Sequence, residues 1–292
     1  MIRNPLAIFI GLWAVLPFSL GAAIDSAFAQ SDDQVRTSVS VWVWIAWGLV
    51  LGSSIIRRPW GLTIMRILAP AAVPTLLVTY WSATMPAGTL AIALSHAVLV
   101  SLLALLPETG HLMVDGLSYG DEKRFLLRVP TAVLFGPLPL VWAITVSGIF
   151  SGPILVTSGR WGVGLPLWGI GWTLAVFATR SMHQLARRWI VFVPNGFVIH
   201  DYLATREPFL LRRQDIFSLG PAAAEIDISS EDLIDVSQLA LGPVLHVVLR
   251  GDVEVVPRSR GVSEVRQVAQ ILFSPTRPGV VLEEAHQRKL LR

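Results

Sequence analysis

The chain has 292 residues, of which 53% are hydrophobic and only 15% are charged, well below the charged share of an average soluble domain. The length would allow two soluble domains, but this composition excludes them and favours a protein embedded in a membrane. The chain contains no cysteine, which excludes disulfides, cysteine-based zinc sites and thiol nucleophiles.

The charges are unevenly distributed along the chain. Residues 1–180 hold ten Lys or Arg and seven Asp or Glu, whereas residues 181–292 hold thirteen of each. We therefore predict a transmembrane domain over 1–180 and a water-exposed domain over 181–292. Because the second domain is neutral by formal count, it lacks the basic footprint of a nucleic-acid-binding protein, and we expect no nucleic-acid partner.

A helix needs about 20 mostly apolar residues to cross the hydrocarbon core of a bilayer. Six stretches meet this requirement, so the sequence predicts an all-α membrane bundle of about six helices whose first partner is the lipid bilayer. The predicted spans are 4–23, 39–56, 62–82, 88–107, 130–150 and 164–179.

The distribution of Lys and Arg predicts the orientation of these spans. With the N-terminus inside, ten of these residues lie in or beside the inner segments and only two, Arg36 and Arg160, lie outside. We therefore expect a multi-pass protein of the cell (plasma) membrane with both termini in the cytoplasm. The inner set is Arg3, Arg57, Arg58, Arg66, Lys123, Arg124, Arg128, Arg180, Arg187 and Arg188.

The first predicted span also resembles a secretory signal. Arg3, an apolar run and Ala27-Phe28-Ala29 imitate its charged start and small-residue cleavage site. The apolar run is longer than a usual signal core, and Asp25 lies inside the cleavage region. We expect an uncleaved helix, with signal cleavage left open; the other five spans keep their orientation either way.

The second domain has the pattern of β-strands followed by a helix. Apolar runs at 189–193 and 197–199 flank Pro194-Asn195-Gly196, and Asn-Gly between such runs is a strong hairpin signal. Arg250-Gly251-Asp252 is a second predicted turn. Further predicted strands are 206–212, 214–219, 225–229, 235–241, 243–250 and 252–257.

A helix is expected after these strands. Ser263 is a potential N-cap, Val265, Val268 and Leu272 would share one face, and Pro275 would end the helix. A short polar helix after Pro278 would close the chain.

The stretch 188–201, with the sequence RWIVFVPNGFVIHD, continues to Leu210-Leu211-Arg212-Arg213-Gln214-Asp215-Ile216. It resembles bacterial pleckstrin-homology-like (PH-like) domains attached to membrane helices. In that family a hairpin and a strand lead into a basic-polar turn, and a C-terminal helix, here 263–274, closes a half-open barrel. The resemblance covers about 35 residues. It implies a β-rich PH-like fold and a scaffolding or membrane-regulatory role, and it does not indicate an activity.

Gly116-Leu117-Ser118-Tyr119-Gly120 matches the G-x-S-x-G nucleophile elbow of hydrolases. The elbow requires a strand before the serine and a helix after it, within a large α/β sheet. A segment between two predicted spans leaves no room for that sheet, so we interpret Ser118 as a loop residue.

Glu108 and His111 would share one face of a helix, as metal ligands do. A metal ion needs three or four ligands, and no second motif of this kind occurs in the sequence. Asp115, Asp121 and Glu122 in the same segment are possible further ligands. We favour a hydrated helix end and predict no metal, cofactor or catalytic residues.

His96 lies midway along the fourth span, where an ionisable side chain is a functional candidate. No Asp, Glu or Lys lies deep in any span to form a proton relay with it, so we expect a neutral histidine bonded to a Ser or Thr. Arg66, one turn inside the third span, is expected to extend to the cytoplasmic interface. His200, His246 and His286 show no ligand spacing.

Prolines interrupt two predicted spans, Pro70 with Pro74 in the third and Pro137 with Pro139 in the fifth. Broken helices mark substrate sites in transporters when they occupy corresponding positions of two repeats; these positions do not correspond. Small residues are expected to permit close helix packing at Gly48, Gly52, Gly164, Gly169 and Gly171.

The sequence thus favours a non-enzymatic membrane protein. It would present a cytosolic PH-like domain for protein or membrane interaction and act as a scaffold or regulator of a cell-envelope complex with protein partners. The alternatives are a transporter or lipid-handling protein that uses the proline-broken helices 3 and 5, with His96 near the path, and an enzyme that uses Ser118 or Glu108 and His111.

Overall fold

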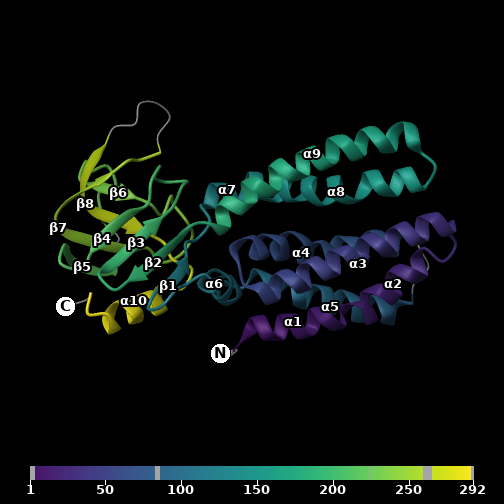
Figure 1. Cartoon of the computed structure of the whole chain (residues 1–292), viewed down its shortest axis with the longest axis horizontal. Helices are drawn as coiled ribbons and strands as arrows, with labels where there is room; N and C mark the ends of the chain where they lie inside the picture. Colours follow the sequence, from purple (N-terminus) through teal and green to yellow (C-terminus); the bar gives the residue numbers. More distant parts are fainter. Residues whose placement is uncertain (1–3, 83–85, 224, 259–264, 291–292) are drawn as a thin grey trace. The chain divides into compact units, whose positions relative to one another are not determined.

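The computed structural model of the chain describes residues 4–82, 86–223, 225–258 and 265–290. It has two compact units: the first holds residues 1–113 and 139–183, and the second holds residues 114–138 and 184–292. The chain therefore passes between the units three times, after residues 113, 138 and 183. Figure 1 shows helices throughout the first unit and both sheets in the second.

The prediction of six long apolar helices is confirmed within the described residues. Six stretches are long and apolar enough to cross a membrane: Pro5–Ala27, Asp33–Ile56, Pro59–Trp81, Ala87–Leu105, Pro137–Thr157 and Trp161–Ala186. The helices are α1 (Pro5–Val15), the 3-10 turn η1 (Leu16–Phe18), α2 (Leu20–Ala27), α3 (Asp33–Ile56), α4 (Pro59–Ser82), α5 (Ala87–Leu105), α6 (Pro107–Asp115), α8 (Pro137–Thr157) and α9 (Trp161–Ala186).

The prolines expected to interrupt the fifth span lie instead at its start. Pro137 is the first residue of α8, and Pro139 lies in the first turn, where the missing N–H of proline has no helical partner to lose. The helical structure is interrupted just before Pro137, at Gly136, which separates α7 from α8. Pro70 and Pro74 do lie inside α4, which continues through both.

Close helix packing depends on some of the expected glycines and not on others. A Cβ at Gly171 would clash with the backbone of Gly148, and one at Gly164 would clash with Val156. These contacts bring α8 and α9 together, as small residues allow in apolar helix pairs. Gly48, Gly52 and Gly169 have no neighbour within 4 Å of an added Cβ, so the prediction is wrong for these three.

The second unit consists of two four-stranded sheets, with the orders β1-β2-β3-β4 and β5-β7-β8-β6. All neighbouring strands are antiparallel except β6 and β8. The elements are β1 (Lys123–Leu126), α7 (Thr131–Phe135), β2 (Trp189–Val193), β3 (Gly196–His200), β4 (Phe209–Arg212), β5 (Ile216–Pro221), β6 (Leu233–Asp235), β7 (Leu245–Val255), β8 (Arg266–Phe273) and α10 (Pro278–Gln287).

Strand β1 lies in a segment that is expected from its sequence to be a loop between two spans. It pairs with β2 in the register Phe125↔Ile190, and Phe125 and Leu126 are buried. The second unit therefore includes residues 114–138 in addition to most of the predicted range 181–292. Four residues are too few to show a strand period when read alone.

The first hairpin is confirmed, with its turn one residue earlier than predicted. Val193 pairs with Gly196, so the two turn residues are Pro194 and Asn195. Gly196 then begins β3 with φ +149°, and an added Cβ would clash with the backbone of Leu211 in β4. Glycine is required there both for its φ and for the close approach of β4.

The predicted helix at 263–274 is wrong, because residues 266–273 form strand β8 between β7 and β6. Val268 and Leu272 are buried in this strand, whereas Val265 is exposed; Ser263 lies outside the described residues. The helical spacing of the apolar residues favours a helix, but pairing with β7 and β6 on the two edges of this segment stabilises a strand instead. The terminal helix is α10, which begins at Pro278, where the short closing helix was expected.

Three other predictions for this region are also wrong. The predicted strand 235–241 does not form, because β6 spans Leu233–Asp235 and residues 236–241 form turns and loop with one isolated bridge at Ala240. Arg250-Gly251-Asp252 is not a turn, because β7 runs from Leu245 to Val255 with a register shift between Val248 and Val253. A bulge of this kind bends a strand without ending it. The described residues within 225–229 form turns and loop instead of a strand.

The core of the second unit is aromatic and continuous between the two sheets. Phe192 packs against Phe125 and Phe197, and Phe197 packs against Phe273, with ring centroids 5.5–5.9 Å apart. All four rings are at most 2% exposed. Because β1, β2, β3 and β8 each supply one ring, this core joins both chain segments of the unit.

Candidate functional site

Ser118 has a structural contact. Its hydroxyl donates to Asp115 Oδ1 at 2.8 Å, and the same oxygen accepts the Arg124 backbone N–H at 2.9 Å. The order of elements here is helix, turn, strand, from α6 to β1, the reverse of a nucleophile elbow. These contacts close the turn that begins β1 and give no support to a nucleophilic serine.

No metal centre is assembled around the candidate ligands. Glu108 and His111 lie on α6, and Asp115 is held by Ser118 and Arg124. Within the described part of the chain, no group of three or more His, Asp or Glu side chains is placed to hold a metal ion.

His96 bridges α5 to the break between α1 and α2. Its Nε2 lies 3.0 Å from the Leu12 carbonyl oxygen, and its Nδ1 lies 2.7 Å from Ser19 Oγ. The contact with Ser19 is the serine or threonine bond expected for this histidine. Arg66 is partly buried, and its Nε has no hydrogen-bond partner among the described residues.

The three histidines of the second unit have separate environments. His200 stacks on Trp189 with ring centroids 4.8 Å apart, and its Nδ1 lies 3.0 Å from the Arg187 carbonyl oxygen. Burial lowers the pKa of His200 below its ordinary value. His246 contacts Gln270, and His286 lies on α10.

The strongest candidate site in the second unit is a cationic pocket that the sequence analysis did not predict. It is a cavity of about 770 Å³, within the range of about 300–1,000 Å³ typical of ligand sites. Four cationic side chains line it, together with Pro194, Asn195, Leu210, Gln214, Ile216 and Leu290. The four cations are Arg212, Arg213, Arg250 and Lys289.

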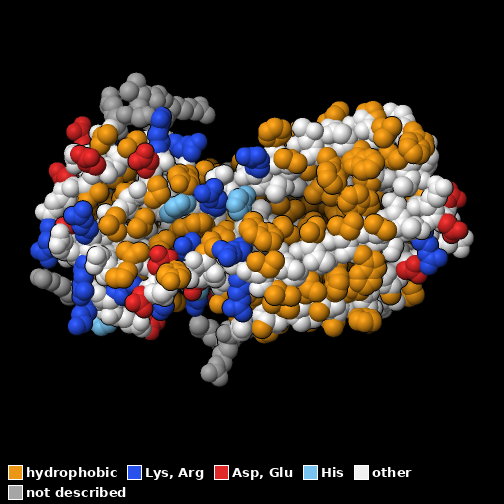
Figure 2. All heavy atoms as spheres, in the orientation of Figure 1, with side chains coloured by type: hydrophobic (Ala, Val, Ile, Leu, Met, Phe, Trp, Pro, Cys, Tyr) orange, Lys and Arg blue, Asp and Glu red, His pale blue; other side chains and the backbone are white. Residues whose placement is uncertain are grey.

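The cations come from separate parts of the fold. Arg212 ends β4, Arg213 follows it in a turn, Arg250 lies in β7 and Lys289 follows α10. Figure 2 shows Lys and Arg side chains gathered on the second unit, toward α10 and the C-terminus. Because these elements are distant in sequence, only the folded sheets bring the four charges together.

Backbone hydrogen bonds fix the loops that carry these charges. The Arg213 N–H donates to the Asn195 carbonyl at 2.7 Å, and the Arg250 N–H donates to the Asp215 carbonyl at 2.7 Å. The Arg250 guanidinium lies 5.5 Å from the centre of the Phe217 ring, a stacking distance. The cationic pocket is therefore held in shape by β-structure.

The electrostatics of the pocket favour an anion. Among the described residues, none of the four cations has an ion-pair partner, and none of the residues that line the pocket is a carboxylate. Like charges gathered without a counter-charge repel one another and attract an anionic group. Guanidinium groups also bind carboxylate or phosphate through two parallel hydrogen bonds.

Glu284 holds α10, and with it Lys289, against the first sheet. Its carboxylate accepts from Lys123 Nζ of β1 at 2.5 Å and from Arg288 Nε at 2.6 Å. Burial alone would raise the pKa of Glu284, but these two hydrogen bonds outweigh it and hold the pKa below its ordinary value. The carboxylate is therefore ionised at neutral pH and fixes one wall of the pocket.

Comparison with known proteins adds no relative to this description. No protein-family model, no curated protein and no solved structure matches the chain.

Proposed function

We propose that the chain is a multi-pass membrane protein whose second unit is a cytoplasmic PH-like domain that binds an acidic segment of a partner protein. In this role it acts as a scaffold or regulator of a cell-envelope complex. The observation that carries the proposal is the cationic pocket, with four cations that have no ion-pair partner among the described residues.

The mixed chemistry of the pocket supports a protein partner over a bare lipid headgroup. Leu210, Ile216 and Leu290 line it beside the cations, and Leu210 is 41% exposed. Phe217, which lies beneath Arg250, is 59% exposed. An acidic peptide that also carries an apolar side chain complements both properties, as interface cores combine apolar anchors with arginine.

The three chain passages between the units support a regulatory role. The chain leaves the second unit after β1 and α7, forms helices α8 and α9, and returns to the second unit before β2. Strands β1 and β2 pair with each other. A partner bound to the second unit would therefore act on a domain to which both ends of the α8–α9 hairpin are covalently joined. A simple C-terminal tail would have one such connection.

The proposed partner is tested with one charge reversal. Arg213→Glu places a carboxylate in the cationic pocket, and we expect it to weaken binding of a labelled acidic peptide at least tenfold. The peptide carries Glu, Asp and one Leu, and binding is measured by fluorescence anisotropy on the full chain in nanodiscs of zwitterionic lipid. Binding to the unaltered chain should also weaken as salt rises.

Arg206→Glu is the matched control, because Arg206 is exposed on the same unit and does not line the pocket. It should change the affinity less than twofold. Equal effects of the two reversals would exclude the pocket as the binding site. If Arg213→Glu abolished association with phosphatidylglycerol bilayers and left peptide binding intact, the partner would be the membrane surface and the proposal would be wrong.

The membrane orientation is tested separately. A phosphatase or fluorescent reporter fused after Arg292 should report cytoplasm, and one inserted near Gly159, between α8 and α9, should report the outer side. The expectation rests on the ten-to-two distribution of Lys and Arg. Reversed signals would overturn both the orientation and the cytoplasmic role of the second unit.

A further inference from the structure

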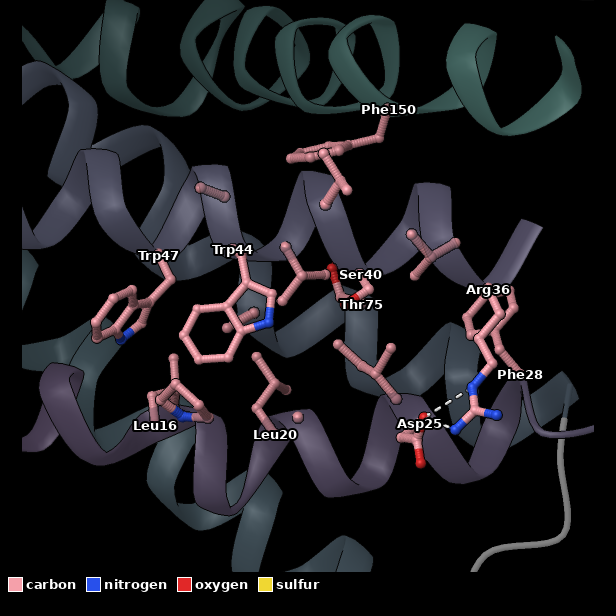
Figure 3. Close-up of a pocket in the computed structure, with 18 of the residues that line it drawn as sticks. Leu16, Leu20, Asp25, Phe28, Arg36, Ser40, Trp44, Trp47, Thr75 and Phe150 are labelled. Carbon is pink, nitrogen blue, oxygen red and sulfur yellow. Dashed lines mark hydrogen bonds and ion pairs between the residues drawn. The ribbon is translucent and has the colours of Figure 1, made fainter. Parts of the chain in front are cut away.

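The first unit contains a groove of about 850 Å³ between the α1–η1–α2 segment and α3. Figure 3 shows Trp44 and Trp47 of α3 facing Leu16 and Leu20 across the groove at one end, and Asp25 and Arg36 at the other. The body of the groove is mainly apolar, with the hydroxyl-bearing side chains of Ser40 and Thr75 among its lining, and its mouth is charged.

The apolar end of the groove carries a reciprocal pair of hydrogen bonds. The Trp13 indole N–H donates to the Trp47 carbonyl, and the Trp47 indole N–H donates to the Trp13 carbonyl, both at 2.9 Å. Both indole donors are thereby satisfied, so this end presents ring carbon to a ligand.

The charged mouth retains hydrogen-bonding capacity. Arg36 Nε and Nη2 both donate to Asp25 Oδ1, at 3.1 and 2.7 Å. Asp25 Oδ2 and Arg36 Nη1 are not used in this pair, and both side chains are about half exposed, 62% and 49%. Asp33, the first residue of α3 and one turn before Arg36, also lines the groove, so two carboxylates and one guanidinium are available to a ligand.

The length of the groove matches one leaflet of a bilayer. Arg36 and Trp47 are eleven residues apart on α3, which corresponds to about 16 Å along a helix at 1.5 Å per residue. This is about half of a hydrocarbon core that is roughly 30 Å thick. An acyl chain whose headgroup sits at Arg36 would therefore reach Trp47.

We propose that this groove binds a phospholipid with a primary ammonium headgroup, of the phosphatidylethanolamine type. One acyl chain lies along the tryptophans, the ammonium donates to Asp25 Oδ2 and Asp33, and the phosphate accepts from Arg36 Nη1. The excess of carboxylate over guanidinium selects the ammonium end, because a choline group has no N–H to donate. The site is separate from the cationic pocket, although both rest on membrane insertion.

The apolar part of the proposal is tested by filling the groove. Gly21 lines it, and an added Cβ would meet only Pro17, at 3.9 Å, so Gly21→Leu introduces a side chain without a backbone clash. We expect this variant to retain at least tenfold less phosphatidylethanolamine, measured by native mass spectrometry of the full chain extracted from bilayers of mixed lipids.

Gly11→Leu is the matched control, because Gly11 lies on α1 outside the groove and has no neighbour within 4 Å of an added Cβ. It should retain lipid as the unaltered chain does. Equal retention by the Gly21→Leu variant would exclude the groove as the lipid site.

The headgroup is tested with a second variant that does not depend on tolerance of a larger side chain. Asp25→Asn removes the exposed carboxylate, and it should reduce retention of phosphatidylethanolamine three- to tenfold. Retention of phosphatidylcholine by the unaltered chain should be at least fivefold weaker than that of phosphatidylethanolamine. Equal retention of phosphatidylethanolamine, phosphatidylcholine and phosphatidylglycerol would show general lipid contact and overturn the proposal.

Discussion

Arg188→Ala is expected to lower the free energy of unfolding of the second unit by about 3–5 kcal/mol, the usual cost of leaving one member of a buried ion pair unpaired. Arg188 is 1% exposed. Its Nε and Nη2 donate to the two carboxylate oxygens of Asp201 at 2.9 and 2.7 Å, and its Nη1 donates to the Arg128 carbonyl at 2.6 Å. The variant leaves Asp201 as a buried charge without its guanidinium.

The effect is measured on the full chain in micelles. Because the chain has no cysteine, Val247→Cys introduces a single buried thiol whose labelling rate reports opening of the second unit; Val247 is 0% exposed. Arg187→Ala is the control: the Arg187 guanidinium lies 5.5 Å from the centre of the Tyr202 ring, a contact worth about 1 kcal/mol or less.

A double variant separates the charge from the packing. Arg188→Met with Asp201→Leu removes both charges together and should lose less stability than Arg188→Ala, because no buried charge is left unpaired. If Arg188→Ala and Arg187→Ala opened the unit to the same extent, the ion pair would have no stabilising role.

The environment of Arg188 shows what local sequence cannot reveal. Arg188 follows an apolar span, as an interfacial cation does, and it is one of the ten Lys and Arg residues from which the orientation is predicted. The hairpin register Trp189↔His200, extended by one pair, places Arg188 opposite Asp201. The ion pair could therefore be predicted from the hairpin, but only with the turn at Pro194-Asn195, because a turn at Asn195-Gly196 gives a different register.

The accuracy of the fold prediction follows the range of the interactions involved. The six helices were predicted because a long apolar run carries its own signal. Strand β8 was mistaken for a helix and β1 for a loop, because both are strands through pairing with β7 and β2. The bulge in β7 was mistaken for a turn, since Arg-Gly-Asp has turn composition whether or not a partner strand continues beside it.

The candidate site was hidden by the charge balance of the second domain. Thirteen cations and thirteen anions predict no charged surface, yet four cations gather in one pocket where no described lining residue is a carboxylate. Arg212 and Arg213 were visible as part of the PH-like resemblance. Arg250 and Lys289 join them only through the pairing of β5 with β7 and the position of α10, which no local pattern contains.

Gly196→Val is expected to destabilise the second unit by about 3 kcal/mol or more. A residue with a Cβ at this φ of +149° is strained, at a cost of about 1–3 kcal/mol. The added Cβ would also clash with Leu211 O and approach Arg212 Cα, and overpacking against backbone costs a further 1–3 kcal/mol or so. Valine has a high intrinsic preference for strands, so propensity alone would predict stabilisation and cannot explain the expected loss of stability.

Gly251→Val is the matched control, because it places the same side chain in strand β7 of the same unit, where an added Cβ has no neighbour within 4 Å and φ is not positive. Its effect on the opening free energy, measured with the Val247→Cys thiol, should be within about 0.5 kcal/mol, as for a surface site. Gly196→Val should also expose the aromatic core that contains Phe197. If β3 shifts by one residue against β4, its alternate residues move to the opposite face of the sheet. Equal labelling rates in the two variants would show that the backbone of β4 yields at Leu211, and that neither the turn at Pro194-Asn195 nor the register it sets depends on glycine.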